Sequence, residues 1–218
     1  MNYKLVCFDL DGCLTERDDS WSFIHRELGV WEQAKKHRKL FFEGKIDYQQ
    51  WADLDVGLWK GTPITKLNKV IKQIKVRPHL ETVIQELKKR KVLVIIISSG
   101  LSFFADRIKE EFGFDFAIAN TPIIGENGKL TGECDVKVKY DDKHEVLDFI
   151  LNDILVAHNI KPKECIAVGD GENDIPLFKK VGYSIAFNPL NENVANSADV
   201  VVKNGGLLDV LSIILSKL

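Results

Sequence analysis

The stretch that decides the fold is Val6-Cys7-Phe8-Asp9-Leu10-Asp11-Gly12-Cys13-Leu14-Thr15. The apolar residues 5–8 (LVCF) predict a short strand covered on both faces, because such strands lose the alternation of apolar and polar residues. Two carboxylates follow, Asp9 and Asp11, and residues two apart on a strand point to the same side. Since open α/β sheets keep their chemistry at the carboxyl ends of strands, these acids predict a site there. A solvated acidic turn after an edge strand would have the same residues, so the interpretation depends on the downstream sequence.

Length, charge and cysteine use indicate a globular cytoplasmic protein. The 218 residues suffice for one large core, or for a core domain with a smaller insert. A net charge of −2 gives no electrostatic reason to expect nucleic acid or a membrane surface as a partner. The four cysteines have no metal-ligand spacing, so we expect them to be reduced in the cytoplasm. We expect no secretory signal and no membrane span, since the longest apolar run, residues 92–97, is too short, and no feature indicates an oligomeric state.

Residues 16–76 have a helical pattern and no plausible buried strand, which predicts an inserted helical bundle. Asp47 is a candidate N-cap in this block, and Gly29 is a candidate helix stop. All four tryptophans of the chain lie here. We expect them to form the core of the bundle; the alternative is that one or two of them line a pocket above the carboxylates.

From residue 77 onward the chain alternates helices and strands, which predicts a parallel sheet with helices on both faces. Residues 92–97 (VLVIII) are the plainest strand, and we expect a helix to start at residues 98–100 (SSG). Further along we expect a short strand over 116–119, a hairpin turn at 126–128, a long helix from Asp141 to about His158, and a strand over 165–168. Residues 1–15 and 77–218 would then form one doubly wound α/β domain.

Polar clusters follow three of the predicted strands. Because the carboxyl ends of parallel strands meet at one edge of a sheet, we expect the three clusters to converge. Each alone is a weak signal, since a polar turn or a helix N-terminus has the same composition, but their common position after strands indicates a site. The clusters are Asp9 with Asp11, Ser98 with Ser99, and Asp170 with Asn173 and Asp174.

The chemistry of these residues suits the transfer of a phosphoryl group. Asp9 and Asp170 supply the hard oxygen ligands of Mg²⁺, which takes few protein ligands and keeps several waters. The stretch from Ser98 to Gly100 would present hydroxyl and backbone N–H groups, as phosphate-binding helix N-termini do. Lys143 is either a solvated helix residue or a fixed positive charge in the same site. Together these groups would neutralise a phosphoryl group in transfer.

In these motifs the chain resembles the haloacid dehalogenase superfamily of aspartyl phosphatases, and within it the phosphoserine-phosphatase branch. The resemblance covers essentially the whole chain, with four motifs in the expected order: DLDG at 9–12, ISSG at 97–100, Lys143, and GDGEND at 169–174. It implies a Rossmann-like core with a helical cap inserted directly after the first motif, where residues 16–76 lie. It also implies a Mg²⁺-dependent phosphatase that acts on a small phosphorylated metabolite.

The resemblance further implies a role for each motif residue. Asp9 would be the nucleophile that forms a phospho-aspartyl intermediate, and Asp11 would be the acid and base for the leaving oxygen and then the water. The metal ligands would be Asp9, Asp170 and the backbone carbonyl of Asp11. Asp174 would position Lys143 or a metal-bound water. The groups around the phosphoryl oxygens would come from Ser98, Ser99, Gly100, Lys143 and Asn173.

The cap departs from the pattern of this branch. Phosphoserine phosphatases hold the substrate amine with an acid near the start of the cap, a place that Asp18 or Asp19 could fill. They bind the substrate carboxylate with a cap arginine, and an ungapped match puts Asp55 at that place. Because an acid cannot replace a bidentate guanidinium, either Arg17 or Lys60 takes over or the substrate is not phosphoserine, and we favour the second.

Two other classes of function remain open from the sequence. One is a phosphotransferase, which would pass the phosphoryl group from Asp9 to a small alcohol instead of water. The other is a non-catalytic binding module that keeps the fold. For a phosphatase, we expect residues 16–76 to act as a mobile lid whose inner face selects the leaving group. With Asp55 on that face, phosphoserine would be a poorer substrate than a phosphorylated amine or a neutral alcohol.

Overall fold

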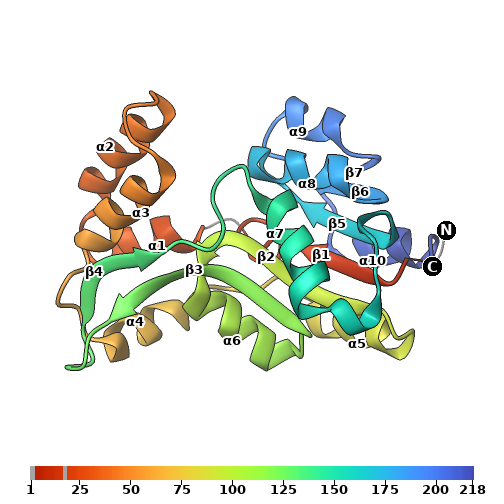
Figure 1. Cartoon of the computed structure of the whole chain (residues 1–218), viewed down its shortest axis with the longest axis horizontal. Helices are drawn as coiled ribbons and strands as arrows, with labels where there is room; N and C mark the ends of the chain where they lie inside the picture. Colours follow the sequence, from red (N-terminus) through yellow and green to blue (C-terminus); the bar gives the residue numbers. More distant parts are fainter. Residues whose placement is uncertain (1–2, 17–18) are drawn as a thin grey trace.

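The computed structural model describes residues 3–16 and 19–218, which form a seven-stranded sheet with helices around it (Figure 1). The strand order is β4-β3-β2-β1-β5-β6-β7, and every neighbouring pair is parallel except β3 with β4. The predicted doubly wound α/β fold is therefore confirmed. The strands are β1 (Leu5–Phe8), β2 (Leu93–Leu101), β3 (Phe116–Ile124), β4 (Leu130–Asp135), β5 (Cys165–Gly169), β6 (Tyr183–Phe187) and β7 (Val200–Val202).

Helices cover both faces of the sheet because side chains alternate along each strand. In β1, Val6 and Phe8 join the buried cluster that contains α5, α6 and α10, whereas Leu5 and Cys7 join the cluster of α7, α8 and α9. Among the described residues no helix combines the length and apolar character needed to cross a membrane. The helices are α1 (Ser20–Glu27), α2 (Trp31–Phe42), α3 (Tyr48–Gly57), α4 (Ile64–Ile71), α5 (Leu80–Lys89), α6 (Ser102–Phe112), α7 (Lys143–Phe149), α8 (Ile175–Lys180), α9 (Glu192–Ser197) and α10 (Leu207–Leu215).

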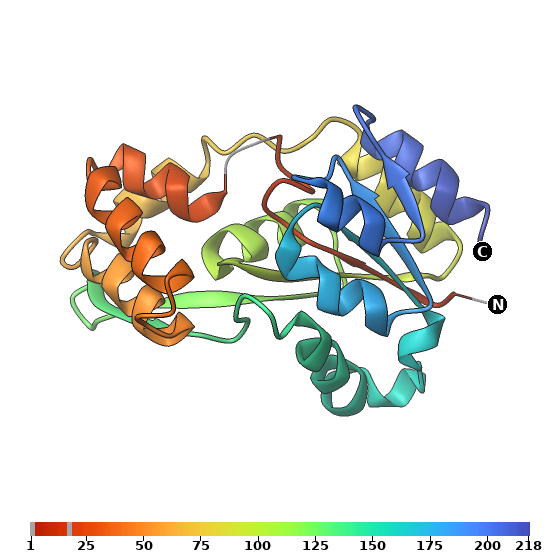
Figure 2. The same cartoon turned by 90° about the horizontal axis from the view of Figure 1, so that it is seen from above.

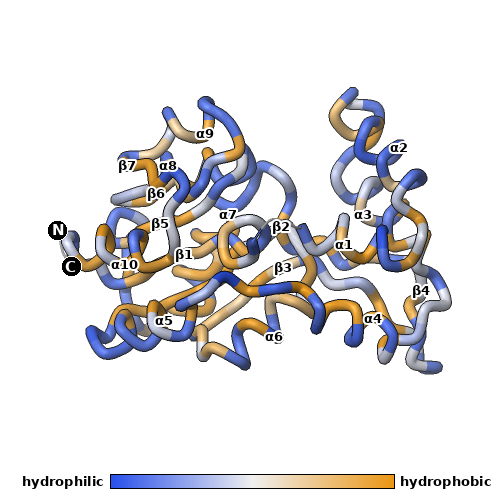
Figure 3. The backbone as a smooth tube through the Cα atoms, turned by 180° about the vertical axis from the view of Figure 1, so that it is seen from behind, coloured by the Kyte–Doolittle hydropathy of each residue, from blue (hydrophilic) through white to orange (hydrophobic). Residues whose placement is uncertain are grey.

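Helices α1 to α4, which we call the cap helices, lie at the end of the molecule away from the termini (Figures 1 and 2). Asp47 caps α3 as predicted, in a reciprocal pair with Gln50, and Gly29 follows α1 with a φ of 73° that only glycine adopts freely. Helix α2 is mostly hydrophilic (Figure 3) and buries Ala34. The cap is thus fixed by the apolar faces of α1, α3 and α4, which join the same buried cluster as β1.

The hairpin of β3 and β4 extends along the cap helices, with α2 and α3 above it and α4 below it in Figure 1. Its turn lies where the sequence predicts it, at 126–128. Backbone hydrogen bonds tie it to the segment before α4: Gly61 N donates to Leu130 O at 2.9 Å, and Leu130 N donates to Thr62 O at 3.0 Å. Cys134 N also donates to Oδ1 of Asp53 in α3 at 3.0 Å. The cap therefore rests on this hairpin as well as on the core, while the boundaries 16 and 76 of the insert remain a hypothesis.

Two strands are longer than the sequence suggests. β2 continues through residues 98–100, and α6 begins only at Ser102, so the expected helix start at residues 98–100 is wrong. The pairing of β2 with β3 shifts register between Ile97 and Leu101, which lets the strand continue past its apolar run. β3 continues to Ile124, beyond the short strand expected over 116–119. Pairing with β4 holds residues 120–124 in the strand, and the hairpin expected around 126–128 already implied a strand segment just before its turn.

The long helix expected from Asp141 to His158 is also wrong in its extent. Helix α7 begins at Lys143, with Asp142 as its N-cap, and ends at Phe149. A π-helical turn follows, in which Leu155 N donates to Ile150 O at 2.7 Å, across five residues instead of four. This wider turn keeps Ile150 buried before the chain turns at the left-handed Asn159.

The tryptophans divide between the two interpretations. Trp59 is fully buried in the cap, and its Nε1 donates to Nδ1 of His25 at 3.0 Å. Trp21, Trp31 and Trp51 line the cavity above the strand ends instead. Trp21 also packs against the buried cluster, so the expectation that all four form the bundle core is wrong for Trp31 and Trp51.

Asn120, in β3, joins three segments through its fully buried amide. Its Oδ1 accepts from the backbone N–H groups of Lys137 and Val138, each at 2.9 Å. Its Nδ2 donates to Ser99 O at 2.9 Å and to Val138 O at 2.9 Å. Because each buried backbone group without a partner costs about 1–3 kcal/mol, this one side chain stabilises β2, β3 and the segment before α7 together.

We predict that Asn120→Ala lowers the free energy of unfolding by about 3 kcal/mol or more, because several buried backbone groups lose their partners. Asn120→Asp keeps the acceptor but loses the two donors, and we expect an intermediate loss. Urea denaturation followed by circular dichroism measures both. The matched control is Asn127→Ala in the exposed hairpin turn, expected within about 0.5 kcal/mol of wild type. An Asn120→Ala protein as stable as this control would contradict the assignment.

Candidate active site

The carboxyl ends of β1 and β5 lie side by side, because these strands pair in parallel with Phe8 opposite Val168. Asp9 follows β1 and Asp170 follows β5. Carboxylate oxygens of Asp9, Asp170 and Asp174 lie within 4.8 Å of one another, and the three side chains are buried. The first and third predicted clusters therefore do meet at one edge of the sheet.

Lys143 lies between two of these acids. Its Nζ is 2.7 Å from Oδ1 of Asp9 and 2.6 Å from Oδ1 of Asp174, and its side chain is fully buried. The other oxygen of Asp174 accepts from the backbone N–H groups of Asp170 and Gly171, each at 3.0 Å. Asp174 thus holds the lysine and the loop after β5 and has little capacity left for a further ligand. Lys143 lies inside the site and is not a solvated helix residue.

Two carboxylates of this cluster, those of Asp9 and Asp170, resist ionisation. Burial and, to a smaller extent, the charge of Asp174 raise the pKa of Asp9 to about 6, against the lowering effect of Lys143. Burial and the neighbouring Asp9 raise the pKa of Asp170 well above its usual range. Burial opposes the charge on Lys143, but Asp174 and Asp9 outweigh it and hold the pKa of the lysine above its ordinary value. The cluster therefore has more negative charge than Lys143 alone can balance.

This surplus of negative charge fits a hard divalent cation. Since the oxygens of Asp174 are engaged, Asp9 and Asp170 remain as carboxylate donors, which suits an ion that keeps several waters. Gly12 leaves the space that Asp170 needs: a Cβ there would lie 2.3 Å from Oδ2 of Asp170, and the residue has a φ of 83°. The residues present are those that would hold Mg²⁺, with the backbone carbonyl of Asp11 as the third expected ligand.

Asp11 joins the core to the first residue of the cap helix α1. Its Oδ1 accepts from Ser20 N at 2.9 Å, and its Oδ2 accepts from Ser20 Oγ at 2.8 Å. Burial raises the pKa of Asp11 well above its usual range, and the charges of Asp19 and Asp9 add to the effect. A Cβ at Gly100 would lie 2.2 Å from Oδ2 of Asp11, so only glycine leaves room there. This carboxyl is held in place and favours its protonated form.

The second predicted cluster also lies at this edge. Ser98 is buried, and its Oγ accepts from Gly100 N at 3.0 Å. Ser99 Oγ accepts from Nδ2 of Asn173 at 3.2 Å, which links the second cluster to the third. The carbonyl of Ser99 also accepts from Trp21 Nε1 and from the hydroxyl of Tyr48, each at 3.0 Å. The cap helices α1 and α3 are thus anchored directly on the strand that bears these serines.

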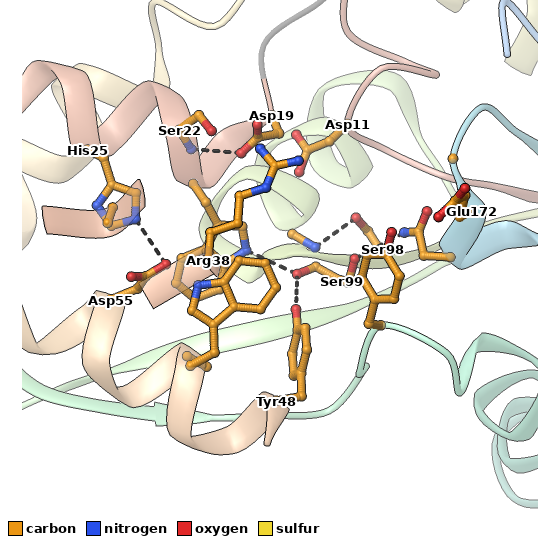
Figure 4. Close-up of a pocket in the computed structure, with 18 of the residues that line it drawn as sticks. Asp11, Asp19, Ser22, His25, Arg38, Tyr48, Asp55, Ser98, Ser99 and Glu172 are labelled. Atoms are coloured by element: carbon orange, nitrogen blue, oxygen red, sulfur yellow. Dashed lines mark hydrogen bonds and ion pairs between the residues drawn. The ribbon is translucent and has the colours of Figure 1, made fainter. Parts of the chain in front are cut away.

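A cavity of about 220 Å³ lies between this edge and the cap. In Figure 4, Ser98, Ser99 and Glu172 lie at one end of it, and His25 and Asp55 lie at the other. The cap side of its wall is largely aromatic. The aromatic side chains that line the cavity are Trp21, Trp31, Phe42, Tyr48, Trp51 and Tyr140.

At the cap end the predicted Asp55 does line the cavity, but two histidines flank it. Nδ1 of His37 is 2.8 Å from its Oδ1, and Nε2 of His25 is 3.2 Å from its Oδ2. Asp19 also lines the cavity, and it caps α1 by accepting from Ser22 N at 2.7 Å. The other candidate acid for the substrate amine, at position 18, lies outside the described residues.

Of the two basic residues considered in place of the cap arginine, Lys60 does not line the cavity. Lys60 has its side chain against Gly132, away from the cavity wall, and Arg17 lies outside the described residues. Arg38 in α2 lines the cavity instead, and in Figure 4 it extends toward Asp11 and Asp19.

Sequence reasoning missed Arg38, the two histidines and Asn120. The KKHRK run at 35–39 shows only a basic helix, and its pattern does not reveal which residue faces inward. His25 follows an apolar residue on α1, and Asn120 follows the apolar residues 116–119. In both cases the available signal was a polar residue next to positions expected to be buried.

Comparison with known proteins agrees with this geometry. Residues 3–182 match the family model described as haloacid dehalogenase-like hydrolase. The phosphoserine phosphatase of Methanocaldococcus jannaschii is 37% identical over 214 residues, which cover 97% of each chain. That of Archaeoglobus fulgidus is 32% identical over 211 residues, which cover 97% of this chain and 60% of the relative.

Solved structures of the same kind superpose closely. A phospho-aspartyl intermediate analogue of phosphoserine phosphatase has a TM-score of 0.82, with 36% identity and 98% and 99% of the two chains covered. A substrate-bound phosphoserine phosphatase complex has the same values. From the matched family model and these similarities, the chain belongs to the haloacid dehalogenase-like hydrolase family and is a phosphomonoester hydrolase similar to phosphoserine phosphatases.

Proposed function

We propose that this enzyme releases phosphate from a small phosphorylated metabolite, with Mg²⁺ as cofactor and a covalent intermediate on Asp9. The supporting observation is the position of Lys143, which is buried between Asp9 and Asp174 at the strand edge where Asp170 also lies. A buried cation held against an acid in this way keeps that acid oriented and attracts a phosphate dianion. From the cysteine pattern we further infer that the enzyme acts in the cytoplasm.

In the first step, an oxygen of Asp9 attacks phosphorus, and the bond from phosphorus to the leaving oxygen breaks. Asp11 donates its proton to that oxygen, which its raised pKa favours. Lys143, Ser98 and Asn173 hold the phosphoryl oxygens as the charge redistributes. The products of this step are the free alcohol and a phospho-aspartyl group on Asp9.

In the second step, Asp11, now ionised, takes a proton from a water molecule that attacks phosphorus. The bond between phosphorus and Asp9 breaks, which restores the carboxylate and releases phosphate. Transfer to a small alcohol would follow the same route, with the alcohol in the place of water, and comparing products with and without candidate acceptors separates the two reactions.

Mg²⁺ would be held by Asp9, Asp170 and the backbone carbonyl of Asp11. When bound, it supplies positive charge that offsets the phosphoryl oxygens and the carboxylates. The protein contributes by leaving room at Gly12 for the side chain of Asp170 and by holding Asp174 against Lys143.

The lid would choose the leaving group, because the core motifs face only phosphate and metal. Contacts from Ser20 to Asp11, and from Trp21 and Tyr48 to the Ser99 carbonyl, would hold residues 16–76 over the cavity. A closed lid excludes bulk water before attack.

We predict that Asp9→Asn abolishes turnover of an aryl phosphate while the protein keeps its fold, because an amide cannot form the acyl phosphate. Phosphate release and circular dichroism measure the two properties. Asp153→Asn, at an exposed acid in the turn after α7, is the control and should retain activity. Near-normal turnover in Asp9→Asn would remove Asp9 from the nucleophile role.

We predict that activity requires Mg²⁺, that Ca²⁺ supports it poorly, and that protons compete with the metal. Asp9 has a pKa of about 6 without metal, so its ionised form, and with it activity, is lost as the pH falls through that value. A nearby cation favours ionisation, so raising the Mg²⁺ concentration should move this acid limb to lower pH. Profiles of kcat/KM against pH at two Mg²⁺ concentrations test this. A rate that survives exhaustive chelation would show that the metal assignment is wrong.

We predict that phosphoserine is a poorer substrate than a phosphorylated amine or a neutral alcohol phosphate, because its carboxylate would meet Asp55. A close contact between buried like charges costs on the order of several kcal/mol, and His37 offsets part of it. Asp55→Arg should therefore narrow the gap in kcat/KM by roughly tenfold or more. A wild-type enzyme that prefers phosphoserine would show that Asp55 does not repel the substrate carboxylate.

A further inference from the structure

The Asp11 turn, which we define as residues 10–16, has little support from the sheet. It follows the end of β1, and among the described residues its one β-bridge joins Thr15 to Val76. The other side of Asp11 is attached to the cap, because Ser20 of α1 binds both of its carboxylate oxygens. Movement of α1 would therefore displace Asp11 unless the core holds this turn in place.

Arg77 supplies this support from the segment that follows α4. Its Nη2 donates to Gly12 O at 2.8 Å and to Glu16 O at 3.3 Å, and its Nε donates to Cys13 O at 3.0 Å. Its own backbone N–H donates to Leu14 O at 2.8 Å. One residue thus binds four carbonyl groups of the Asp11 turn. These bonds join the segment before α1 to the segment after α4, the two places where the chain passes between the core and the cap helices.

The charge of Arg77 serves these carbonyl oxygens and not a carboxylate. Its side chain is partly buried, and among the described residues its guanidinium forms no ion pair. Its Cζ lies 4.8 Å from the centroid of the Phe187 ring, at the end of β6, and this contact helps to fix the plane of the group. A guanidinium is a rigid fork that reaches several acceptors at once, and its charge strengthens each hydrogen bond. Lysine has the charge but lacks the fork, so it would not hold the same carbonyls together.

The restraint reaches the acids through Gly12. Its N–H donates to Oγ1 of Thr15 at 2.8 Å while its carbonyl accepts from Arg77, so the peptide groups on both sides of this glycine are fixed. A Cβ at this position would lie 2.3 Å from Oδ2 of Asp170, so the backbone here packs directly against that carboxylate. Asp11 is the residue before Gly12, and the position of its side chain therefore depends on the same backbone.

We infer that Arg77 is a positioning residue, which holds the Asp11 turn so that the carboxyl of Asp11 stays aligned with the leaving oxygen when the cap moves. This inference rests on the proposed function, in which Asp11 is the proton donor. Arg77 does not line the cavity, so it acts on the reaction only through the turn. A displacement of about 1 Å at a reacting group can lower a rate roughly 100-fold, so even a small loosening of the turn is measurable.

The test uses two leaving groups that depend on Asp11 to different degrees. Butyl phosphate releases a strongly basic alkoxide unless an acid protonates the oxygen, whereas nitrophenyl phosphate releases a stable phenolate and needs little protonation. The measured quantity is the ratio of kcat/KM for butyl phosphate to kcat/KM for nitrophenyl phosphate, because kcat/KM reflects only the steps up to release of the alcohol. We expect Arg77→Lys to lower this ratio roughly tenfold or more. Asp11→Asn, which has no proton to donate, should lower it further.

Arg107→Lys is the matched control, because it makes the same substitution at another arginine that binds backbone carbonyls. Arg107 in α6 is also partly buried, and its Nη1 donates to Ile71 O at 2.7 Å and to Ile74 O at 3.4 Å, at the end of α4 and not in the Asp11 turn. Both variants should have a lower melting temperature than the wild type, but only Arg77→Lys should change the ratio. A purely structural role of Arg77 would lower the two kcat/KM values by the same factor.

The outcomes separate the positioning role from the phosphatase function. If Arg77→Lys keeps the wild-type ratio, or if Arg107→Lys lowers it equally, the positioning role is wrong and the phosphatase proposal stands. Should Arg77→Lys not fold, Phe187→Leu replaces it, since it removes only the ring against the guanidinium, and the ratio should then fall about twofold; an unchanged ratio again overturns the role. If Asp11→Asn keeps the ratio, or if the wild type hydrolyses neither ester with Mg²⁺, the proposed function fails and the role of Arg77 fails with it.

Discussion

The sheet edge that carries the candidate active site depends on one buried cation, Lys143, which lies between Asp9 and Asp174. Removing one partner of such a group leaves a buried charge unpaired, which costs about 3–5 kcal/mol. The three residues come from the end of β1, the start of α7 and the loop after β5, so the ion pairs join segments that are distant in sequence. Lys143 alone does not balance the three carboxylates of Asp9, Asp170 and Asp174, which suits the site to a divalent cation, and the charge of that cation would in turn favour a phosphate.

The cap is tied to this edge through the groups that do the chemistry. Ser20, the first residue of α1, binds both oxygens of Asp11, and Trp21 and Tyr48 bind the carbonyl of Ser99. Moving the cap helices therefore changes the surroundings of Asp11, the proton donor in our proposal, and of the strand that bears Ser98 and Ser99 at once. Closure and catalytic competence would be coupled by these few hydrogen bonds rather than by the apolar contacts alone.

The far end of the cavity differs chemically from the phosphate end. Near the strands the groups are ionisable and closely paired, whereas the cap offers aromatic rings and one carboxylate that lies between two histidines. If the cap end contacts the leaving group, as we propose, the fold can keep one reaction and change its substrate, because function depends on the site and not on the fold alone.

The sequence by itself determined the core and its reacting groups. The hydrophobic runs end in acids, in hydroxyls or in the GDGEND motif, and this pattern predicts a parallel sheet. It also predicts the edge at which Asp9, Ser98 and Asp170 meet, since strand polarity decides where the carboxyl ends of strands lie. Local pattern could not reveal the extension of β2 through residues 98–100, which depends on pairing with β3, nor which residue of the KKHRK run faces the cavity. It also placed Asp55 correctly but not its partners, because His25 and His37 reach it only when α1, α2 and α3 pack together. Orientation of side chains between helices is a property of packing, and only the tertiary structure decided what the cap end of the cavity can recognise.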